Sequence, residues 1–332
     1  MQYYSNKLKA LKDILGTNAI TLTDTELIVD KKKYLIVEDV IILLDPRQYP
    51  QTLKKRLALQ HAQEAFIAEC KEGIQYSFGD EWTRFPYILP EHKNEFKLYF
   101  DIVNINEYAD KRVCDLGCGI GRWSYFFQPF CREIILLDFS EAIFVARNNL
   151  KECSNAFFFM GDIEHLPFKY DFCDFIFCLG VLHHLETPAL TAIRRLKPYA
   201  PSSLYYLYYA LDNRPAHYRY LLATVTILRK VLCTIRNPKV RDIITTVIAI
   251  CIYLPLVYIG KLFNLFGKGA LVPLYEGHKN DSLHRIRQDV YDRFFTGIEQ
   301  RFTKKEIMTL TDTYSQVTIA NTEGYWHFYC LR

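Results

Sequence analysis

Asp115-Leu-Gly-Cys-Gly-Ile-Gly121 lies where a predicted strand, residues 112–115, gives way to a predicted helix. Gly117, Gly119 and Gly121 let the backbone approach a ligand closely, and the N-terminus of a helix favours polar or anionic groups. A glycine-rich turn by itself also fits a tight turn that binds nothing. The meaning of this stretch therefore depends on the segments around it.

The sequence after the turn alternates between short apolar strands and helices. Continuous apolar strands separated by helices are typical of a parallel sheet that is covered on both faces. A capping-box spacing at Thr303–Glu306 opens a late helix, and the connection between the two closing strands is so short that they must be antiparallel. The predicted strands are 133–138, 157–160, 174–178, 204–209, 317–320 and 325–330, and the predicted helices include 141–150 and 188–196.

Two acidic residues follow the next two strands. Asp138 ends the strand after the glycine turn, where a carboxylate can accept hydrogen bonds from two ribose hydroxyls. Asp162 follows the third strand, at a place suited to an adenine amino group. Each residue alone also fits an ordinary loop or helix cap. Their order at successive strand ends predicts a nucleoside-binding site.

The segment 111–210 resembles the core of a class I S-adenosylmethionine-dependent methyltransferase, of the subgroup that includes quinone-biosynthesis methyltransferases. The resemblance implies an α/β Rossmann-like fold with a seven-stranded, mostly parallel sheet whose last strand is antiparallel. It also implies S-adenosyl-L-methionine as the methyl donor. The matching blocks are Val113-Cys-Asp-Leu-Gly-Cys-Gly-Ile-Gly121, Leu137-Asp-Phe-Ser140, Gly161-Asp-Ile-Glu-His-Leu-Pro-Phe168 and Gly180-Val-Leu-His-His-Leu185.

The same resemblance implies a set of cofactor-binding residues. Backbone contacts are expected from Gly117 to Gly121, ribose binding from Asp138, adenine contacts from Asp162 and Ile163, and contacts to the methionine end from Leu179. Trp82 and Arg84 lie in an aromatic segment similar to one that covers the cofactor in some related methyltransferases, although a surface helix packed on the sheet is an equal alternative. The full set of expected cofactor-binding residues is Asp115, Gly117, Gly119, Gly121, Asp138, Phe139, Asp162, Ile163, Leu179, Trp82 and Arg84.

A dehydrogenase is the weaker alternative for the glycine-rich turn. The dinucleotide fingerprint requires G-x-G-x-x-G, and here the third glycine comes one residue early. A protein of the same fold that binds the cofactor without catalysis is a further alternative, and it predicts donor binding without turnover.

Methyl transfer from a sulfonium is an in-line displacement, and an amine, thiolate or phenolate acceptor needs little acid or base assistance. An alcohol or a carbon acid needs a general base. His183 and His184, after the fourth strand, are the nearest candidates for that base. The structural alternative for the pair is one buried ring and one solvated ring.

The chain is longer than a bare core of this kind. We expect a small β-rich N-terminal unit at 1–60, a helical lead-in over the cofactor cleft at 61–110, the core at 111–212 and 291–332, and a helical insert at 213–290. The N-terminal unit is somewhat similar to the zinc ribbons of related enzymes, but no cysteine occurs before Cys70, so we expect no metal.

The insert follows a strand on the ligand-binding side of the sheet, so it is expected to determine the acceptor. Residues 214–241 carry seven Lys or Arg and no acidic residue, and 243–260 is free of charge. A helical cap or homodimer interface, a basic amphipathic surface resting on anionic lipid, and a membrane span all fit this pattern. The first two readings favour a small apolar or lipid-linked acceptor and a possible peripheral membrane contact through 214–260.

Tyr291, Asp292 and Arg293 follow the insert in an aromatic–Asp stretch similar to one near the acceptor in some related small-molecule methyltransferases. They are candidate acceptor-site residues, with an interdomain salt bridge as the alternative.

Composition supports a folded cytoplasmic protein. The chain has 332 residues, 23% of them charged, and a net charge of +4, so no nucleic-acid partner is expected. Ten scattered cysteines, none in a C-x-x-C pair, indicate free thiols in a reducing compartment, and the N-terminus has no secretory h-region. Since residues 214–241 contribute +7, the remainder sums to 4 − 7 = −3, so the positive charge is local.

Overall fold

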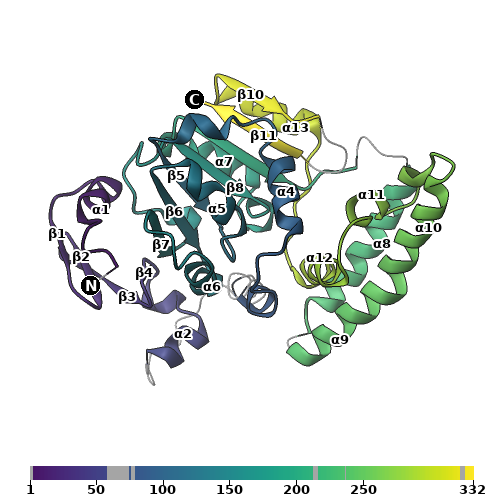
Figure 1. Cartoon of the computed structure of the whole chain (residues 1–332), viewed down its shortest axis with the longest axis horizontal. Helices are drawn as coiled ribbons and strands as arrows, with labels where there is room; N and C mark the ends of the chain where they lie inside the picture. The colour runs from purple at the N-terminus through teal and green to yellow at the C-terminus, as the bar shows by residue number, and fades with distance from the viewer. Residues whose placement is uncertain (1–2, 58–74, 76–78, 212–215, 236, 322–325) are drawn as a thin grey trace. The chain divides into compact units, whose positions relative to one another are not determined.

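The computed structural model describes residues 3–57, 75, 79–211, 216–235, 237–321 and 326–332. The chain divides into two compact units, Met1–Arg214 with Ile298–Arg332, and Pro215–Gly297. We call them the sheet unit and the helical unit and describe each by itself (Figure 1).

The centre of the sheet unit is a seven-stranded sheet in the order β7-β6-β5-β8-β9-β11-β10. The first five of these strands are parallel, and β11 lies antiparallel to both β9 and β10. The sequence prediction of a parallel core with an antiparallel last strand is confirmed. The strands are β5 (Arg112–Leu116), β6 (Glu133–Asp138), β7 (Ala156–Met160), β8 (Phe175–Leu179), β9 (Ser202–Leu207), β10 (Gln316–Ile319) and β11 (Trp326–Leu331).

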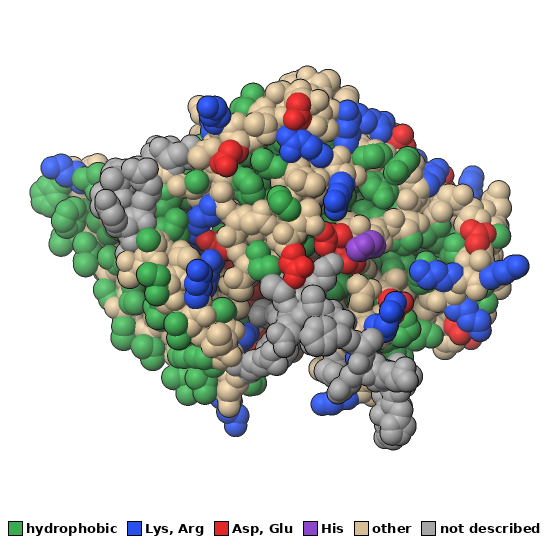
Figure 2. All heavy atoms as spheres, turned by 180° about the vertical axis from the view of Figure 1, so that it is seen from behind, with side chains coloured by type: hydrophobic (Ala, Val, Ile, Leu, Met, Phe, Trp, Pro, Cys, Tyr) green, Lys and Arg blue, Asp and Glu red, His purple; other side chains and the backbone are tan. Residues whose placement is uncertain are grey.

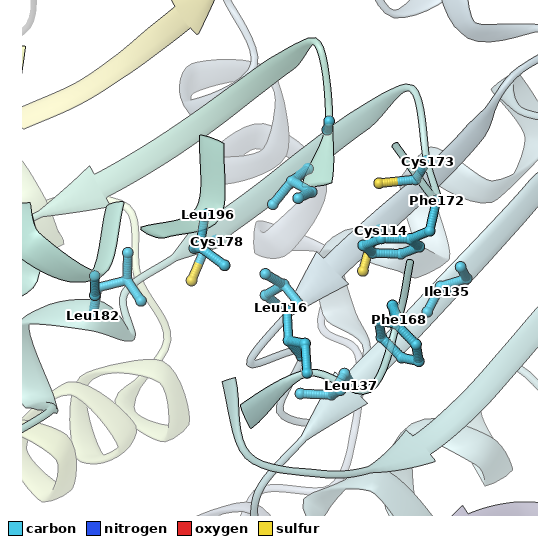
Figure 3. Packing of buried hydrophobic residues seen from close by; sticks show 14 of the residues in the cluster. Cys114, Leu116, Ile135, Leu137, Phe168, Phe172, Cys173, Cys178, Leu182 and Leu196 are labelled. Atoms are coloured by element: carbon cyan, nitrogen blue, oxygen red, sulfur yellow. The ribbon is translucent and has the colours of Figure 1, made fainter. Parts of the chain in front are cut away.

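Helices cover both faces of this sheet because alternate strand residues point to opposite sides. Ile135 and Leu137 pack on the face that α1 (Leu8–Leu15), α7 (Ala189–Leu196) and α13 (Lys304–Met308) cover. Ile134 and Leu136 pack on the other face, against α4 (Glu91–Tyr99), α5 (Arg122–Phe127) and α6 (Ala142–Asn149). Figure 3 shows the first face, where the thiols of Cys114, Cys173 and Cys178 lie among Leu, Ile and Phe side chains.

The N-terminal strands extend the core sheet instead of forming a separate unit. β1 (Ile20–Leu22), β2 (Glu26–Val29), β3 (Lys32–Val37) and β4 (Val40–Ile42) form an antiparallel meander. β4 then pairs in parallel with β7, with Ile41 opposite Phe159, which makes a sheet of 11 strands. The predicted β-rich character is correct, but the predicted separation at 1–60 is wrong, because an unpaired edge of β7 is completed by β4.

A buried arginine ties the N-terminal helix α1 to the core. Arg112 at the start of β5 forms ion pairs with Asp13 of α1 (2.7 Å) and with Glu133 of β6 (2.6 Å). Its guanidinium also donates to the carbonyl of Phe172 over 2.8 Å. Burying an arginine is tolerated where its donors are satisfied in this way.

Short elements connect these parts of the sheet unit. The helix α2 (Gln51–Arg56) follows the meander, and residues 61–74 and 76–78 of the predicted lead-in lie outside the described range. Residues 79–84 are helical. The short 3-10 turns are η1 (Pro46–Gln48), η2 (Ile105–Tyr108), η3 (Gln128–Phe130), η4 (Ile163–His165), η5 (Leu182–His184), η6 (Lys197–Tyr199) and η9 (Thr309–Asp312).

The helical unit consists of α8 (Ala216–Leu232), α9 (Pro238–Ile248), α10 (Leu254–Asn264), α11 (Tyr275–His278) and α12 (Leu283–Phe295), with the 3-10 turn η8 (Gly269–Leu271). A π-helical turn, η7 (Ala249–Tyr253), joins α9 and α10 into one helix that accommodates Pro255. Within the described residues, this helix, Pro238–Asn264, is long and apolar enough to cross a membrane by length and composition. The expected boundary at 291 falls inside α12, whose hydrogen-bonded turns continue to Phe295, so the unit ends later.

Candidate cofactor site

The glycine turn joins β5 to α5 in a backbone conformation that favours glycine. Gly117 and Gly119 have φ values of +75° and +53°, in the left-handed region. A Cβ atom on Gly117 would lie 2.5 Å from Cγ2 of Val181, closer than carbon atoms can approach. The N–H groups of Gly117 and Cys118 both donate to the carbonyl of Leu137, at 2.7 and 3.1 Å. The turn is therefore fixed against the end of β6.

Asp138, at the end of β6, binds the same turn through its side chain. Its Oδ2 accepts from the N–H of Gly119 at 2.8 Å, and its Oδ1 accepts from both the N–H (2.8 Å) and the hydroxyl (2.7 Å) of Ser140. Burial raises the pKa of this carboxyl group, and the hydrogen bonds oppose that rise. A carboxylate oxygen can accept two hydrogen bonds, so Oδ2 keeps capacity for a ligand hydroxyl.

A second buried carboxyl group lies at the end of β5. Asp115 is 1% exposed, and its Oδ2 accepts from the hydroxyl of Ser124 on α5 at 2.6 Å. Burial raises the pKa of Asp115 to about 8, and the negative charge of Asp138 contributes to the rise. Burial is thus the main cause of the raised pKa values of both neighbouring carboxyl groups.

The end of β7 is joined to the end of β6. Gly161 donates its N–H to the carbonyl of Asp138 at 2.9 Å, which brings the third predicted strand end beside the second. Asp162 then caps η4, with Oδ1 accepting from the N–H of Glu164 at 2.9 Å and Oδ2 lying 3.2 Å from Nδ1 of His165. Ile163 packs on the apolar core. The structure thus brings the residues expected at the nucleoside end to one edge of the sheet.

Trp82 lies over the glycine turn. Its indole ring is 3.2 Å from where a Cβ of Gly119 would be, and it packs with Ile120 and Ala142. The guanidinium of Arg122 lies 5.0 Å from the centre of the Trp82 ring, within cation–π range. This places Trp82 where a covering residue was expected.

Two residues close to Trp82 in the sequence also make polar contacts. Gln75 donates its side-chain amide to the carbonyl of Phe139 at 2.9 Å. Arg84 pairs with Asp80 one helical turn earlier, at 3.1 Å. Leu179 is buried at the end of β8, directly before Gly180, whose φ is +80°. Phe139 is partly buried against the α4–α6 face of the core.

Comparison with known proteins identifies the part of the chain that contains the glycine turn. Residues 113–198 match the family model described as a methyltransferase domain. The chain carries a class I S-adenosylmethionine-dependent methyltransferase domain. An uncharacterized methyltransferase of Bacillus subtilis (strain 168), YcgJ, is 37% identical over 81 residues, which are 24% of this chain and 32% of that protein. A tRNA U34 carboxymethyltransferase of Sulfurimonas denitrificans is 31% identical over 83 residues, 24% of this chain and 28% of that protein.

The similarity covers the methyltransferase domain and not the whole chain. The matched part of the chain spans about a third of the length of these curated relatives. Among solved structures, magnesium protoporphyrin IX methyltransferase from Synechocystis PCC 6803 with bound S-adenosylhomocysteine aligns with a TM-score of 0.40 at 13% identity. That alignment covers 85% of this chain and 95% of that one. The YcgJ structure aligns with a TM-score of 0.36 at 26% identity, over 42% of this chain and 59% of that one.

Both candidate general bases of the methyltransferase domain are buried. His183 is 0% and His184 is 2% exposed, so the expected alternative of one solvated ring is wrong. The His183 ring stacks near Tyr208, with centres 4.0 Å apart, and Nδ1 of His184 lies 2.7 Å from the carbonyl of Ile298. Burial, reinforced by His184 and Arg301, lowers the pKa of His183 well below its usual value. His183 is therefore a neutral ring inside the core.

The candidate acceptor residues lie in the helical unit, on α12. Tyr291 is buried, and its hydroxyl accepts from the guanidinium of Arg241 at 3.0 Å. Arg293 pairs with Asp289 on the same helix at 3.2 Å. The backbone carbonyl of Asp292 accepts from the hydroxyl of Thr296 at 2.7 Å. These contacts lie within the unit, whereas the sequence alternative was a salt bridge between domains.

Sequence reasoning missed two side chains that shape the methyltransferase site. Ser124 supports Asp115, and Arg122 lies against the rings of both Trp82 and Trp123, at 5.0 and 4.5 Å. The only sequence signal for Ser124 is its place on the first turn of the helix after the glycines. The hydroxyl of Ser140 accepts a hydrogen bond from the N–H of Ala142 at the start of α6, at 3.3 Å. Among the described residues, no group of three or more His, Cys, Asp or Glu is arranged to hold a metal.

Proposed function

We propose that the whole chain is a methyltransferase that transfers a methyl group from S-adenosylmethionine to a small or lipid-like acceptor. The observation that carries the proposal is the meeting of the glycine turn, Asp138 and Asp162 at the ends of three adjacent parallel strands, joined by the Gly119–Asp138 and Gly161–Asp138 hydrogen bonds. Ligands of open parallel sheets bind at this edge.

The residues present fit this donor. S-Adenosylmethionine carries positive charge, and when bound it supplies an electrophilic methyl group on a sulfonium. The carboxyl groups of Asp115 and Asp138, whose pKa values are raised mainly by burial, favour a positively charged ligand. We propose that Asp138 accepts a ribose hydroxyl, that Asp162 and Ile163 hold the base, and that Trp82 excludes water from the glycine turn.

The buried histidines favour an acceptor that needs no general base from this pair. An amine, a thiolate or a phenolate meets that condition, because it attacks as soon as it is aligned at about 3 Å from the methyl carbon. Within the class, the quoted sequence blocks favour the quinone-biosynthesis subgroup, and we propose that relationship as well.

The proposal is tested by turnover. The full chain, incubated with methyl-labelled S-adenosylmethionine and a cell extract, is expected to produce a labelled product that mass spectrometry identifies. The Asp138→Ala protein in the same extract is the negative control and should give much less labelled product. Donor binding without any labelled product would instead support a cofactor-binding protein without catalysis. Stabilisation by NAD with no response to S-adenosylhomocysteine would reject both.

A further inference from the structure

The long helix α9–η7–α10 exposes many apolar side chains and buries two polar ones, unlike a helix on the surface of a soluble domain. Arg241 and Thr245 face the interior, with exposures of 1% and 0%. Ile243 and Val247 face outward, with exposures of 62% and 53%. In a soluble domain the apolar stripe of a helix faces the core. Here Arg241 and Thr245 share the interior face with Ile248, Ala249 and Val257, and apolar side chains also cover the outer face. Apolar side chains on the outer face together with polar ones inside are typical of proteins whose surroundings are lipid.

The buried guanidinium of Arg241 is bonded inside the helical unit, so its inward position is part of the packing. Nε of Arg241 donates to the carbonyl of Ile235 at 2.5 Å, and its Nη1 donates to Tyr291 at 3.0 Å. The guanidinium also lies 5.1 Å from the centre of the Phe295 ring. Rotating the helix to bury Ile243 would break these contacts of Arg241.

The most exposed apolar residues lie where α10 ends. Leu265 and Phe266 are each 78% exposed, and Leu262 is 58% exposed. We use the term apolar face for the exposed hydrophobic side chains of 243–266. Figure 2 shows hydrophobic side chains gathered over the helical unit, at the left of that view. Apolar exposure concentrated in this way marks a surface that meets an apolar partner.

The stretch of sequence that contains the apolar face is mostly positive in charge. Between residues 214 and 275 the sequence contains nine Lys or Arg and one acidic residue, Asp242, which pairs with Arg287. Lys261 and Lys268 are exposed on either side of the Leu265–Phe266 tip. Lysines beside exposed Leu and Phe suit the boundary between anionic headgroups and acyl chains.

We propose that the apolar face is a docking surface for an anionic lipid bilayer, with Leu265 and Phe266 entering the acyl region and Lys261 and Lys268 at the headgroups. The helical unit then brings the methyltransferase domain to a cytoplasmic membrane surface, where a lipid-like acceptor is available. The inference rests on the helical unit and does not require the proposed enzymatic function.

The test is flotation of the full chain with phosphatidylcholine vesicles, with and without phosphatidylglycerol. The wild type is expected to float with the anionic vesicles and to bind neutral ones more weakly. The pair Leu265→Asp with Phe266→Asp is expected to weaken partition by about tenfold or more, since two large apolar side chains no longer leave water. Leu98→Asp, which changes a 53% exposed leucine of the sheet unit, is the matched control and should leave partition unchanged.

Charge reversal provides the second arm of the test. Lys261→Glu with Lys268→Glu is expected to remove the preference for anionic vesicles and to make the remaining binding insensitive to salt. Calorimetry with S-adenosylhomocysteine on each variant reports whether the methyltransferase domain is intact, so loss of docking is distinguished from loss of the proposed function.

Four results would overturn the inference. The first is a wild type that floats with neither vesicle. The second is a Leu265→Asp/Phe266→Asp protein that floats as well as the wild type. The third is a wild-type dimer without vesicle binding that the same variant converts to a monomer, which would assign the face to a second copy of the chain. If the protein stays in the membrane after alkaline carbonate extraction, the helix spans the bilayer and does not dock on its surface.

Discussion

Asp138 accepts a hydrogen bond from the backbone N–H of Gly119 at 2.8 Å, across the gap between two adjacent strand ends. The same carboxylate accepts two hydrogen bonds from Ser140 through its other oxygen. A single side chain therefore shapes the glycine turn and the start of the next loop. Besides its expected role in ribose binding, Asp138 therefore fixes the backbone of the glycine turn, which the sequence did not reveal.

Asp138→Ala is expected to weaken S-adenosylhomocysteine binding by well over tenfold. The substitution removes the predicted ribose acceptor and leaves the N–H of Gly119 without its partner. Isothermal titration calorimetry measures the effect. Asp110→Ala, at an exposed aspartate of the same unit, is the control and should bind normally. Equal affinity in the two variants would refute the assignment of Asp138.

Gly117→Ala is expected to reduce both donor affinity and thermal stability. Its φ of +75° strains any residue with a Cβ, and the added carbon would meet Val181 at 2.5 Å. A fall of several degrees in Tm, about 1–2 kcal/mol or more in free energy of unfolding, is the expected size. Gly277→Ala, where no atom lies within 4 Å of the new carbon, is the matched control. Similar losses in both variants would contradict this explanation.

The sheet and the order of site residues were predictable from the sequence because each depends on local pattern. The strand 133–138 was predicted with the bounds that β6 has, and the capping box at Thr303 forms with Glu306 as expected. Asp138 and Asp162 could be placed because parallel strands bring their carboxyl ends to one edge. Periodicity and turn chemistry contain this information without any knowledge of distant contacts.

What could not be predicted depends on long-range packing. The pairing of β4 with β7 joins Ile41 to Phe159, and nothing in either strand specifies the other. The burial of His184 depends on the carbonyl of Ile298, more than a hundred residues away. The sequence could not decide whether Trp82 covers the cofactor or lies in a surface helix packed on the sheet. Its contact with Gly119 joins two segments that are not adjacent in sequence.

Asp115 is expected to make donor binding depend on pH. With a pKa of about 8, its carboxyl group is largely protonated at neutral pH in the free protein. A cationic donor favours the carboxylate, so S-adenosylmethionine affinity should rise between about pH 6 and 8, with release of a proton. Calorimetry in buffers of different ionisation enthalpy measures that proton. Asp115→Asn should abolish the proton release, and persistence of the release would exclude Asp115 as its source.

The same residue gives a stability signature with a defined sign. The folded pKa of Asp115 lies above the ordinary value of about 4, so the native state binds the proton more tightly than the unfolded chain. The free energy of unfolding should therefore fall as pH rises from about 4 to 8. The Asp115→Asn protein should not lose this stability. The Tm of the variant relative to that of the wild type should therefore increase as pH rises from about 4 to 8. A constant difference in Tm would contradict the shift.

His278 is expected to stabilise the helical unit below about pH 9. Burial by itself lowers the pKa of His278, but Asp289 and Asp281 outweigh it and raise the pKa to about 9. The ring nitrogens lie 2.9 Å from Asp281 and 3.4 Å from Asp289. Since the folded pKa exceeds the unfolded value of about 6.5, the contribution is complete below pH 6.5 and is lost as pH rises through 9.

The measurement is thermal unfolding of wild type and His278→Gln between pH 6 and 10. The variant should be less stable at pH 6, and the two curves should converge above about pH 9. His165→Gln, at an exposed histidine of the sheet unit, is the control and should follow the wild type. A difference between His278→Gln and wild type that stays constant through pH 10 would exclude an ionised His278.

The parallel pairing of β4 with β7 has a practical consequence for anyone who expresses this protein. A shortened gene that begins near residue 111, the start of the recognisable domain, would remove the meander and strip β7 of its neighbour. The exposed row of amide and carbonyl groups would then be available to other chains, and aggregation is the expected outcome. Residues 1–42 are therefore expected to keep in solution a domain that begins near residue 111.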